Sequence, residues 1–147
     1  MTHDPITWRH QVPAQLRFTD VDPFGHVNNS VYFALFDMAK TQYVMQVVGD
    51  TFLHTTAIVV ANIQADFIAP IYYPDEIAIQ TAVTHLGHKS FVFAQRAINV
   101  RTQEVKCICR TTMVTFDIAA KAAVELPAHF RRQVADYEGI PAAPVNG

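Results

Sequence analysis

The sequence predicts an α+β fold in which one helix lies across a curved antiparallel sheet of about five strands. An apolar segment from Val31 to Val48 contains neither proline nor glycine and predicts a helix of roughly five turns. Four runs of β-branched and aromatic residues follow, and the short turns between them indicate hairpins, hence an antiparallel sheet. With 147 residues, the chain has the length of one domain.

The N-terminal part of the chain predicts a strand followed by a tight turn. A strand is expected within residues 6–19, edged or interrupted by Pro13, because a proline cannot donate to a central ladder. The segment Asp22-Pro-Phe-Gly25 then predicts a turn, in which the proline fixes φ and the glycine can adopt a positive φ.

The predicted helix has clear signals at both ends. Residues 28–30 are all good N-cap types, and Gly49 ends the helix in the usual C-terminal manner. The helix is apolar nearly all round, with a narrow polar stripe on which Asp37 and Lys40 are spaced for a surface ion pair. Such a helix is usually enclosed, which indicates a sheet wrapped about it.

The remaining elements follow in order, and we expect a single domain over residues 1–147. Cys107 and Cys109 are two positions apart in one predicted strand, so their side chains lie side by side on one face and not in bridging geometry. This spacing predicts two reduced core thiols. The expected elements are strands at 56–69, 75–86, 89–100 and 104–117, a short helix near 128–137 and a loose tail at 141–147.

Composition limits the environment and the partners of the chain. Half of the residues are hydrophobic and 16% are charged, which excludes a disordered chain and indicates apolar surface covered by a second subunit, hence a homo-oligomer. The net charge of −2 gives no general attraction to nucleic acid. No apolar run is long enough to cross a bilayer and the N-terminus has no signal-peptide pattern, so we expect a cytoplasmic protein.

Several common catalytic arrangements do not fit the sequence. Neither of its two serines, Ser30 and Ser90, stands in Gly-x-Ser-x-Gly, and the five scattered glycines build no phosphate loop. His85 and His88 form an H-x-x-H pair, but no carboxylate or cysteine lies near them in sequence. We therefore expect neither a metal nor a cofactor.

The turn and the helix start together suit thioester chemistry. Asp22 is followed about seven residues later by the free N–H groups of a helix N-terminus, which pairs a base or nucleophile with an oxyanion site. A thiolate leaves without strong acid assistance, so this pair is sufficient for thioester hydrolysis. Local spacing also fits a carboxylate that only accepts N–H bonds from its own turn. Asp20 is a second candidate that better suits a solvated or turn-stabilising charge, and His26 either orients a ligand or packs beside the helix.

The stretch from Asp20 to Tyr32, together with the helix that follows, resembles the signature of the hotdog-fold acyl-CoA thioesterases of the 4-hydroxybenzoyl-CoA thioesterase type. The similarity continues in residues 73–77, in the hairpin at 86–91 and in the strand that ends at Phe116, and it covers most of the chain from about residue 15 to 130. The resemblance implies a dimer whose sheets join, often paired again into a tetramer, with active sites between subunits.

Carried over position by position, the resemblance implies a set of site residues. Asp22 takes the catalytic role, and the backbone N–H of Asn29 polarises the thioester carbonyl. His26 with the Asn28-Asn29 pair departs from the aromatic-thioester members and is more similar to general acyl-CoA thioesterases. The acyl pocket would include Tyr32 and Phe36, and candidates for the phosphates of CoA, here part of the substrate, are Lys89, Ser90, Arg96 and Lys121.

Other functions stay open on the sequence alone. The acyl group could be carried by acyl carrier protein instead of CoA, or the chain could be a non-catalytic acyl-CoA-binding module. A hydratase of the same fold fits less well, since the sequence shows no paired catalytic His and Asp in an equivalent loop. The choice between Asp22 as a nucleophile and Asp22 as a general base is open as well.

Overall fold

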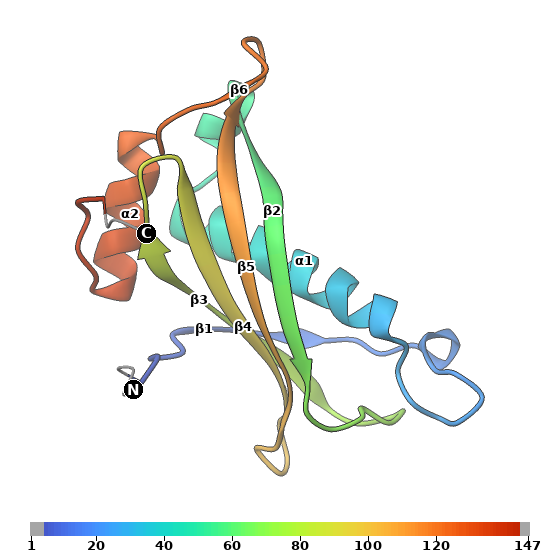
Figure 1. Ribbon diagram of the computed structural model, residues 1–147. Helices are drawn as coiled ribbons and strands as arrows, with labels where there is room; N and C mark the ends of the chain where they lie inside the picture. The colour runs from blue at the N-terminus through green and yellow to red at the C-terminus, as the bar shows by residue number, and fades with distance from the viewer. Residues whose placement is uncertain (1–4, 145–147) are drawn as a thin grey trace.

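The computed structural model describes residues 5–144, and in it a curled antiparallel sheet wraps around α1 (Figure 1). The sheet has the order β1-β3-β4-β5-β2, with β6 paired to β5. The predicted α+β architecture is confirmed. Its elements are β1 (His10–Ala14), α1 (Asn29–Val47), β2 (Thr56–Phe67), β3 (Ile77–Leu86), β4 (Ser90–Asn99), β5 (Val105–Asp117), β6 (Ala122–Ala123) and α2 (Ala128–Glu138), with short 3₁₀ turns at Phe18–Asp20 and Thr51–His54.

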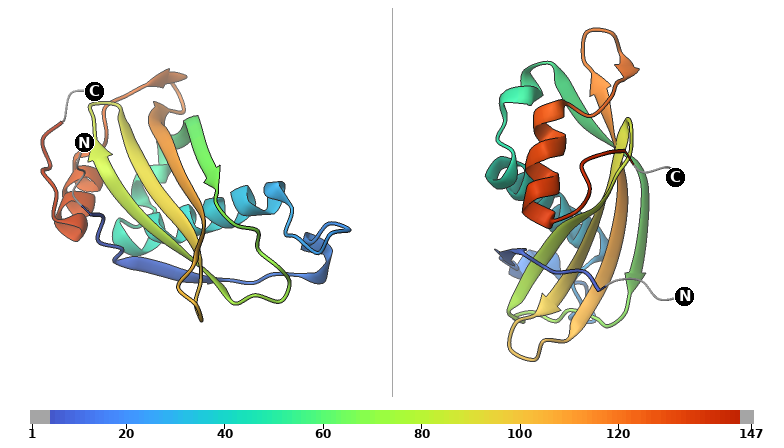
Figure 2. Two further views of the ribbon diagram at one scale, coloured as in Figure 1. Left: turned by 60° about the horizontal axis from the view of Figure 1, so that its bottom comes forward. Right: turned by 90° about the vertical axis from the view of Figure 1, so that its left-hand side faces the viewer.

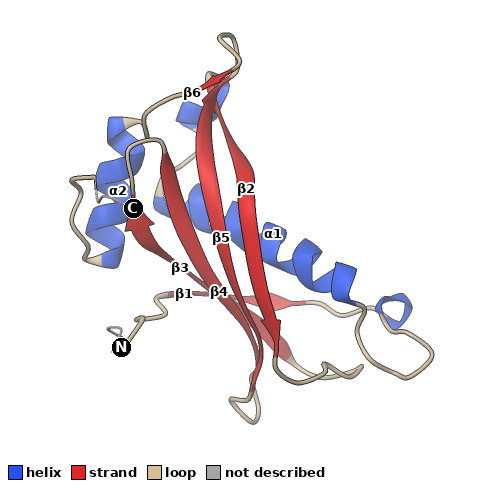
Figure 3. Cartoon of the chain, viewed as in Figure 1, coloured by secondary structure: helices blue, strands red, loops and turns tan. Residues whose placement is uncertain are grey.

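Both helices lie on the same side of the sheet, as the right-hand view of Figure 2 shows. Strand residues alternate between this side and the outer face of the sheet. On β4, Phe91, Phe93 and Gln95 point toward the helices and are buried, whereas Arg96 belongs to the outward-facing set. No described helix covers the outer face (Figure 3).

Strand β1 is shorter than predicted. It covers only His10–Ala14, and the chain leaves the sheet before the 3₁₀ turn at Phe18–Asp20. Pro13 pairs with Ala78 on this edge strand, the position where a missing N–H is tolerated. Within the predicted range, Leu16 and Phe18 alternate with Arg17 and Thr19 as in a strand, but this alternation does not indicate sheet pairing.

Helix α2 occupies the place expected for the C-terminal helix and is anchored by a buried carboxylate. Glu138 accepts hydrogen bonds from the Tyr43 hydroxyl at 2.6 Å and from the Val83 N–H at 2.9 Å. Arg9 Nη1 lies 3.9 Å from the same carboxylate. These contacts connect α2 to α1 and β3. The predicted loose tail is held at its start, because Ala142 packs against the core, whereas residues 145–147 lie outside the described part of the chain.

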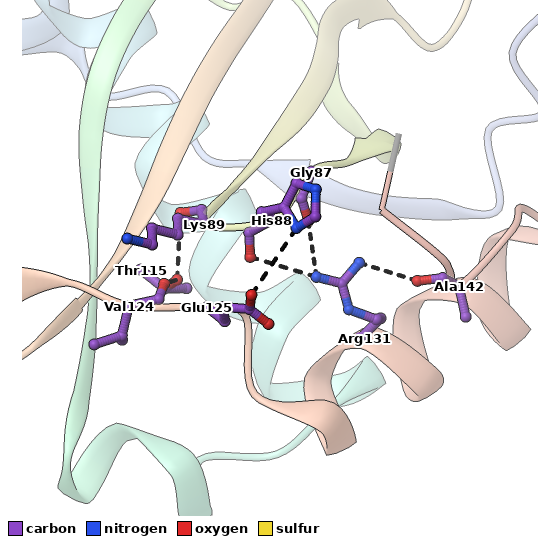
Figure 4. Close-up of polar contacts among 8 residues, drawn as sticks. All are labelled: Gly87, His88, Lys89, Thr115, Val124, Glu125, Arg131 and Ala142. Atoms are coloured by element: carbon purple, nitrogen blue, oxygen red, sulfur yellow. Dashed lines mark hydrogen bonds and ion pairs between the residues drawn. The ribbon is translucent and has the colours of Figure 1, made fainter. Parts of the chain in front are cut away.

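The β3–β4 hairpin is fixed to α2 and to the end of β5 (Figure 4). Arg131 Nη2 donates to the Gly87 carbonyl at 2.8 Å, and Nη1 donates to the Ala142 carbonyl at 3.0 Å. The Thr115 N–H donates to the Lys89 carbonyl at 3.0 Å. Backbone carbonyl groups therefore anchor the hairpin to both neighbouring elements.

The two cysteines confirm the prediction of reduced core thiols. Both are free and buried on the face of β5 that meets α1. Burial raises the pKa of the Cys107 thiol to about 12. Of the helices in residues 5–144, none is both long and apolar enough to cross a membrane.

Candidate active site

The loop between β1 and α1 forms a closed turn around Asp22. The Asp22 N–H donates to the His26 carbonyl at 2.8 Å, and Oδ1 of Asp22 accepts from the N–H groups of Phe24 at 2.9 Å and His26 at 3.1 Å. Gly25 has φ +82°, the conformation that the predicted turn requires. One carboxylate oxygen thus serves the turn, while Oδ2 accepts no hydrogen bond from a described residue.

The first turn of α1 presents unused N–H groups. Asn28 is the N-cap, and its side chain makes no capping hydrogen bond. Its own N–H donates to the Asp20 carbonyl at 2.9 Å. Among the described residues, none accepts from the N–H groups of Asn29 and Ser30. Since these groups carry the positive end of the helix dipole, they are available to an oxyanion.

Asp22 and the start of α1 line one cavity of about 300 Å³. His26 and Tyr32 contribute to its wall from the loop and from α1, and the segment from Phe67 to Pro70 closes it from the end of β2. The Asp22 carboxylate and the start of α1, with its unused N–H groups, therefore line the same space.

The connection from β2 to β3 holds this cavity in shape. The Val27 N–H donates to the Ile71 carbonyl at 2.8 Å, and the His26 ring meets the Tyr72 ring edge to face at 5.0 Å. The Ile71 N–H in turn donates to the Tyr32 hydroxyl at 3.3 Å. Burial raises the pKa of Tyr32, so its hydroxyl keeps a proton that can be donated.

The structure brings together four of the residues predicted for the site: Asp22, His26, Asn29 and Tyr32. Asp20 is not solvated; it is buried and supports the turn by accepting from the Arg17 N–H at 2.8 Å. Phe36, one helical turn beyond Tyr32, is buried in the core and does not line the cavity.

The residues predicted to contact CoA phosphates lie elsewhere in the chain. Lys89 and Ser90 belong to the β3–β4 hairpin beside α2 (Figure 4), and Lys121 lies in the exposed turn before β6. Arg96 is on the outer face of the sheet, away from α1, because its strand neighbours Gln95 and Ala97 are buried on the other face. None of them lines the Asp22 cavity of the same chain, and their role in binding CoA stays a prediction.

A second cavity of about 310 Å³ lies between the middle of α1 and strands β2 and β5. Val60 and Met113 are part of its mostly apolar wall, and Asp37 with Lys40 supplies its charges. Lys40 Nζ lies 3.1 Å from the Asp37 carboxylate, but the lysine side chain is only 8% exposed. The ion pair forms as predicted, but the prediction that it lies at the surface was wrong for Lys40, whose side chain is buried.

No local pattern in the sequence indicates that the Phe67–Pro70 segment lines the cavity. It is separated from Asp22 by more than forty positions, and only folding of the sheet brings the two together. Within residues 5–144, no group of three or more His, Cys, Asp or Glu side chains could hold a metal ion.

The fold and the cavity define a class of protein: a sheet wrapped about a helix, with a carboxylate beside the helix start, is the arrangement expected of a hotdog thioesterase. The sequence model of the thioesterase-like superfamily matches residues 16–134, and the chain belongs to this superfamily. It is thus a hydrolase of the thioesterase type.

Individual relatives agree with this assignment. The acyl-CoA thioester hydrolase YbgC of Escherichia coli is 27% identical over 105 residues, which cover 66% of this chain and 78% of YbgC. The crystal structure of PA5185 from Pseudomonas aeruginosa superimposes with a TM-score of 0.80 at 27% identity, covering 88% of this chain and 91% of that one. A Thermus thermophilus thioesterase, solved in complex with coenzyme A and Zn, gives a TM-score of 0.77 at 26% identity, with 89% and 95% covered.

Proposed function

We propose that the protein hydrolyses acyl-CoA thioesters to the free acid and CoA. One observation carries this proposal: a carboxylate oxygen of Asp22 that the turn leaves unused shares a cavity with the uncapped N-terminus of α1. Similarity to YbgC and to a thioesterase solved with coenzyme A supports CoA as the carrier of the acyl group.

In the proposed reaction the thioester carbonyl oxygen accepts from the Asn29 N–H. Asp22 either takes a proton from water as the water oxygen attacks the carbonyl carbon, or attacks that carbon itself to form an anhydride that water then opens. In both routes the carbon–sulfur bond breaks, the thiolate leaves, and a proton from water ends on the thiol. The leaving thiolate has a conjugate acid of pKa about 8.5, so no metal or other cofactor is needed to stabilise it.

The acyl group has an apolar route away from the carbonyl. Across the gap between α1 and β2, the Phe33 and Phe67 rings meet edge to face, with ring centroids 6.2 Å apart. Further along the same gap lies the mostly apolar cavity beside Val60. We place the acyl chain along this gap, with Tyr32 beside the carbonyl end and Phe36 supporting the pocket from the core.

The proposed active form is a homodimer joined along β2. This strand is an edge of the sheet, and its exposed apolar side chains are Val59, Val60, Ile63 and Phe67. Edge strands of this kind favour pairing with a second chain. Two-fold antiparallel pairing would set the Thr56 end of one β2 beside the Phe67 end of the other. Because β6 lies at the Thr56 end, the partner subunit's Lys121 would approach the Asp22 cavity.

The proposed dimer supports a prediction about CoA binding, and the cysteines support a prediction about location. Lys121 and Lys89, which lie far from Asp22 in one chain, could contact CoA phosphates across the interface. The two free thiols support a reducing compartment, the cytoplasm, as the location of the protein.

The substitution Asp22→Asn tests the proposed function. It keeps the shape of the side chain and the two N–H bonds to Oδ1 but removes the charge, so we expect kcat to fall about 10²-fold or more with unchanged thermal unfolding. Asp50→Asn, an exposed carboxylate just beyond α1, is the control and should keep wild-type turnover. Thiol release should be followed across aromatic and aliphatic acyl-CoAs of graded length and across acyl carrier protein thioesters.

Unchanged turnover in Asp22→Asn would remove this residue from the mechanism. Tight binding of acyl-CoA without thiol release from any substrate would contradict the proposed hydrolysis altogether.

A further inference from the structure

A third cavity, of about 610 Å³, lies on the opposite face of the sheet from α1. The N-terminal segment of residues 5–8 forms one wall, and β3, β4 and β5 form the floor. This volume is within the range of about 300–1,000 Å³ that small-molecule pockets occupy. It is separate from the Asp22 cavity, with which it shares no lining residue.

Cations gather in this cavity although the chain as a whole carries a net charge of −2. Arg96 on β4 and Arg110 on β5 both line it, together with His85 on β3. Arg96 pairs across the strands with Ile108, so Arg110 is its diagonal neighbour, with a distance of roughly 7–8 Å between the Cα atoms. This spacing allows both guanidinium groups to reach one phosphate chain. No acidic side chain is among the described lining residues.

Both arginines have unused donors. The Arg96 Nε donates to Gln80 Oε1, but neither terminal nitrogen of Arg96 donates to a described residue, and Arg110 makes no ion pair or hydrogen bond within residues 5–144. Partial burial lowers the pKa of Arg96, which nevertheless stays charged. Arginine guanidinium groups with free N–H donors commonly bind phosphate through two parallel hydrogen bonds.

An aromatic wall and an orphaned hydroxyl complete the cavity. The Arg96 guanidinium carbon lies 4.9 Å from the centre of the Trp8 ring, which holds the arginine in place. The β3 strand has a bulge between Val83 and His85, and Thr84 Oγ1 within it is buried without a hydrogen-bond partner among the described residues. Such an atom is costly unless a bound group satisfies it.

We propose that this outer-face cavity is a second binding site, for a nucleoside phosphate, distinct from the site of thioester hydrolysis. The phosphates contact Arg96 and Arg110, and the base lies against the Trp8 side of the cavity, over the apolar floor of Ala94 and Ile108. A phosphate alone would leave the apolar walls uncovered. A second copy of the chain fits less well, because two-fold stacking of this face would set the same arginines against each other.

The proposal is testable at Trp8, which is the single tryptophan of the chain. ADP or 3′-phospho-ADP should change the Trp8 fluorescence in a saturable way, while inorganic phosphate and adenosine bind at least about tenfold more weakly. Arg96→Gln and Arg110→Gln should each weaken ADP binding by about tenfold or more, since each removes charge-assisted hydrogen bonds. Arg132→Gln, on the exposed side of α2, is the matched control and should bind as the wild type does.

Two sources of the nucleotide are separated by comparing ligands. Equal binding of ADP and coenzyme A assigns the site to free nucleotides, whereas binding of only coenzyme A and 3′-phospho-ADP assigns it to the head group of the coenzyme. Asp22→Asn should leave either result unchanged, so the outcome is independent of the proposed hydrolysis.

The proposal is overturned if no nucleotide changes the Trp8 emission, or if binding survives in both arginine variants with native circular dichroism. It is also overturned if Arg110→Gln changes the oligomeric state in sedimentation and the emission follows protein concentration instead of nucleotide. That result would assign the outer face to a second copy of the chain.

Discussion

At the scale of single residues, the site depends on which oxygens of the Asp22 carboxylate and which backbone N–H groups at the start of α1 are already used in hydrogen bonds. Oδ1 of Asp22 is held by the turn, which fixes the direction of the carboxylate and leaves Oδ2 without a hydrogen bond from a described residue. At the helix start the Asn28 N–H is used by the Asp20 carbonyl, which leaves those of Asn29 and Ser30. The buried Asp20 thus acts on the site through the backbone.

The backbone role of Asn29 can be tested with proline. Asn29 is the first residue of α1, where proline is well tolerated, and Asn28 before it already has the extended conformation that proline demands. Asn29→Pro removes one N–H while keeping the helix, so we expect kcat to fall by about tenfold or more with little change in KM. Steady-state thiol release checks this.

The control is Asn29→Ala, which removes the side chain and keeps the N–H. It should retain kcat within about a factor of three of the wild type. If Asn29→Pro is as active as Asn29→Ala, and both melt as the wild type does, the oxyanion does not bind at this N–H.

At the scale of elements, α2 and the sheet are connected by the buried carboxylate of Glu138. Its partners, the Tyr43 hydroxyl and the Val83 N–H, come from α1 and β3, so one side chain joins three elements. Burial and the hydrogen bond to Glu138 raise the pKa of Tyr43, so its phenol remains a donor.

Glu138→Gln should lower the free energy of unfolding by about 1.5–3 kcal/mol, because the amide replaces a charged acceptor of two buried donors with a neutral one. Urea denaturation at neutral pH measures the change. Glu125→Gln, whose exposed carboxylate lies 3.9 Å from His88 Nδ1, should change stability by less than about 0.5 kcal/mol. Equal effects of the two substitutions would show that Glu138 does not hold α2 in place.

Elements were predictable from the sequence where their signal is local. The helix, the strands β2 to β5 and the Asp22 turn depend on periodicity, caps and turn residues within a few positions, and they lie close to where the sequence predicts them. Strand β1 was overestimated because alternation alone does not show whether a neighbouring strand is present. Alternation does explain Arg96: its neighbours Gln95 and Ala97 are buried against the helix side, so Arg96 points to the other face.

The parts of the site that come from distant segments were not predictable in this way. The Phe67–Pro70 segment meets the start of α1 only in the folded chain, and Lys40 is buried beside a cavity that β2 and β5 also line, neither of which a local pattern encodes. Asp22, His26, Asn29 and Tyr32 could be identified because a single loop and the helix after it supply all four.

At the scale of the whole molecule, the single chain leaves apolar surface that the proposed dimer would cover. Met45 of α1 lies beside Val60 of β2 and is also exposed. Because α1 is apolar nearly all round, the sheet of its own chain does not cover all of its apolar side chains. The helix thus packs one face on its own sheet and leaves another available. In the proposed dimer the same interface would complete the CoA site, since the candidate phosphate contacts at the Thr56 end of β2 would lie beside the cavity of the second chain.

Ile63→Lys therefore tests oligomer and activity together. Ile63 lies on the edge strand β2 with 42% of its surface exposed, and a lysine there disfavours strand pairing without disturbing the core. We expect sedimentation velocity to show a monomer, and kcat/KM for acyl-CoA to fall at least about tenfold because phosphate contacts from the partner are lost. Thr102→Lys, at the exposed turn between β4 and β5, adds the same charge and should leave both quantities unchanged. A monomeric Ile63→Lys protein with full activity would show that each chain carries a complete site. If the site is shared, raising the protein concentration until the dimer re-forms should restore the lost activity.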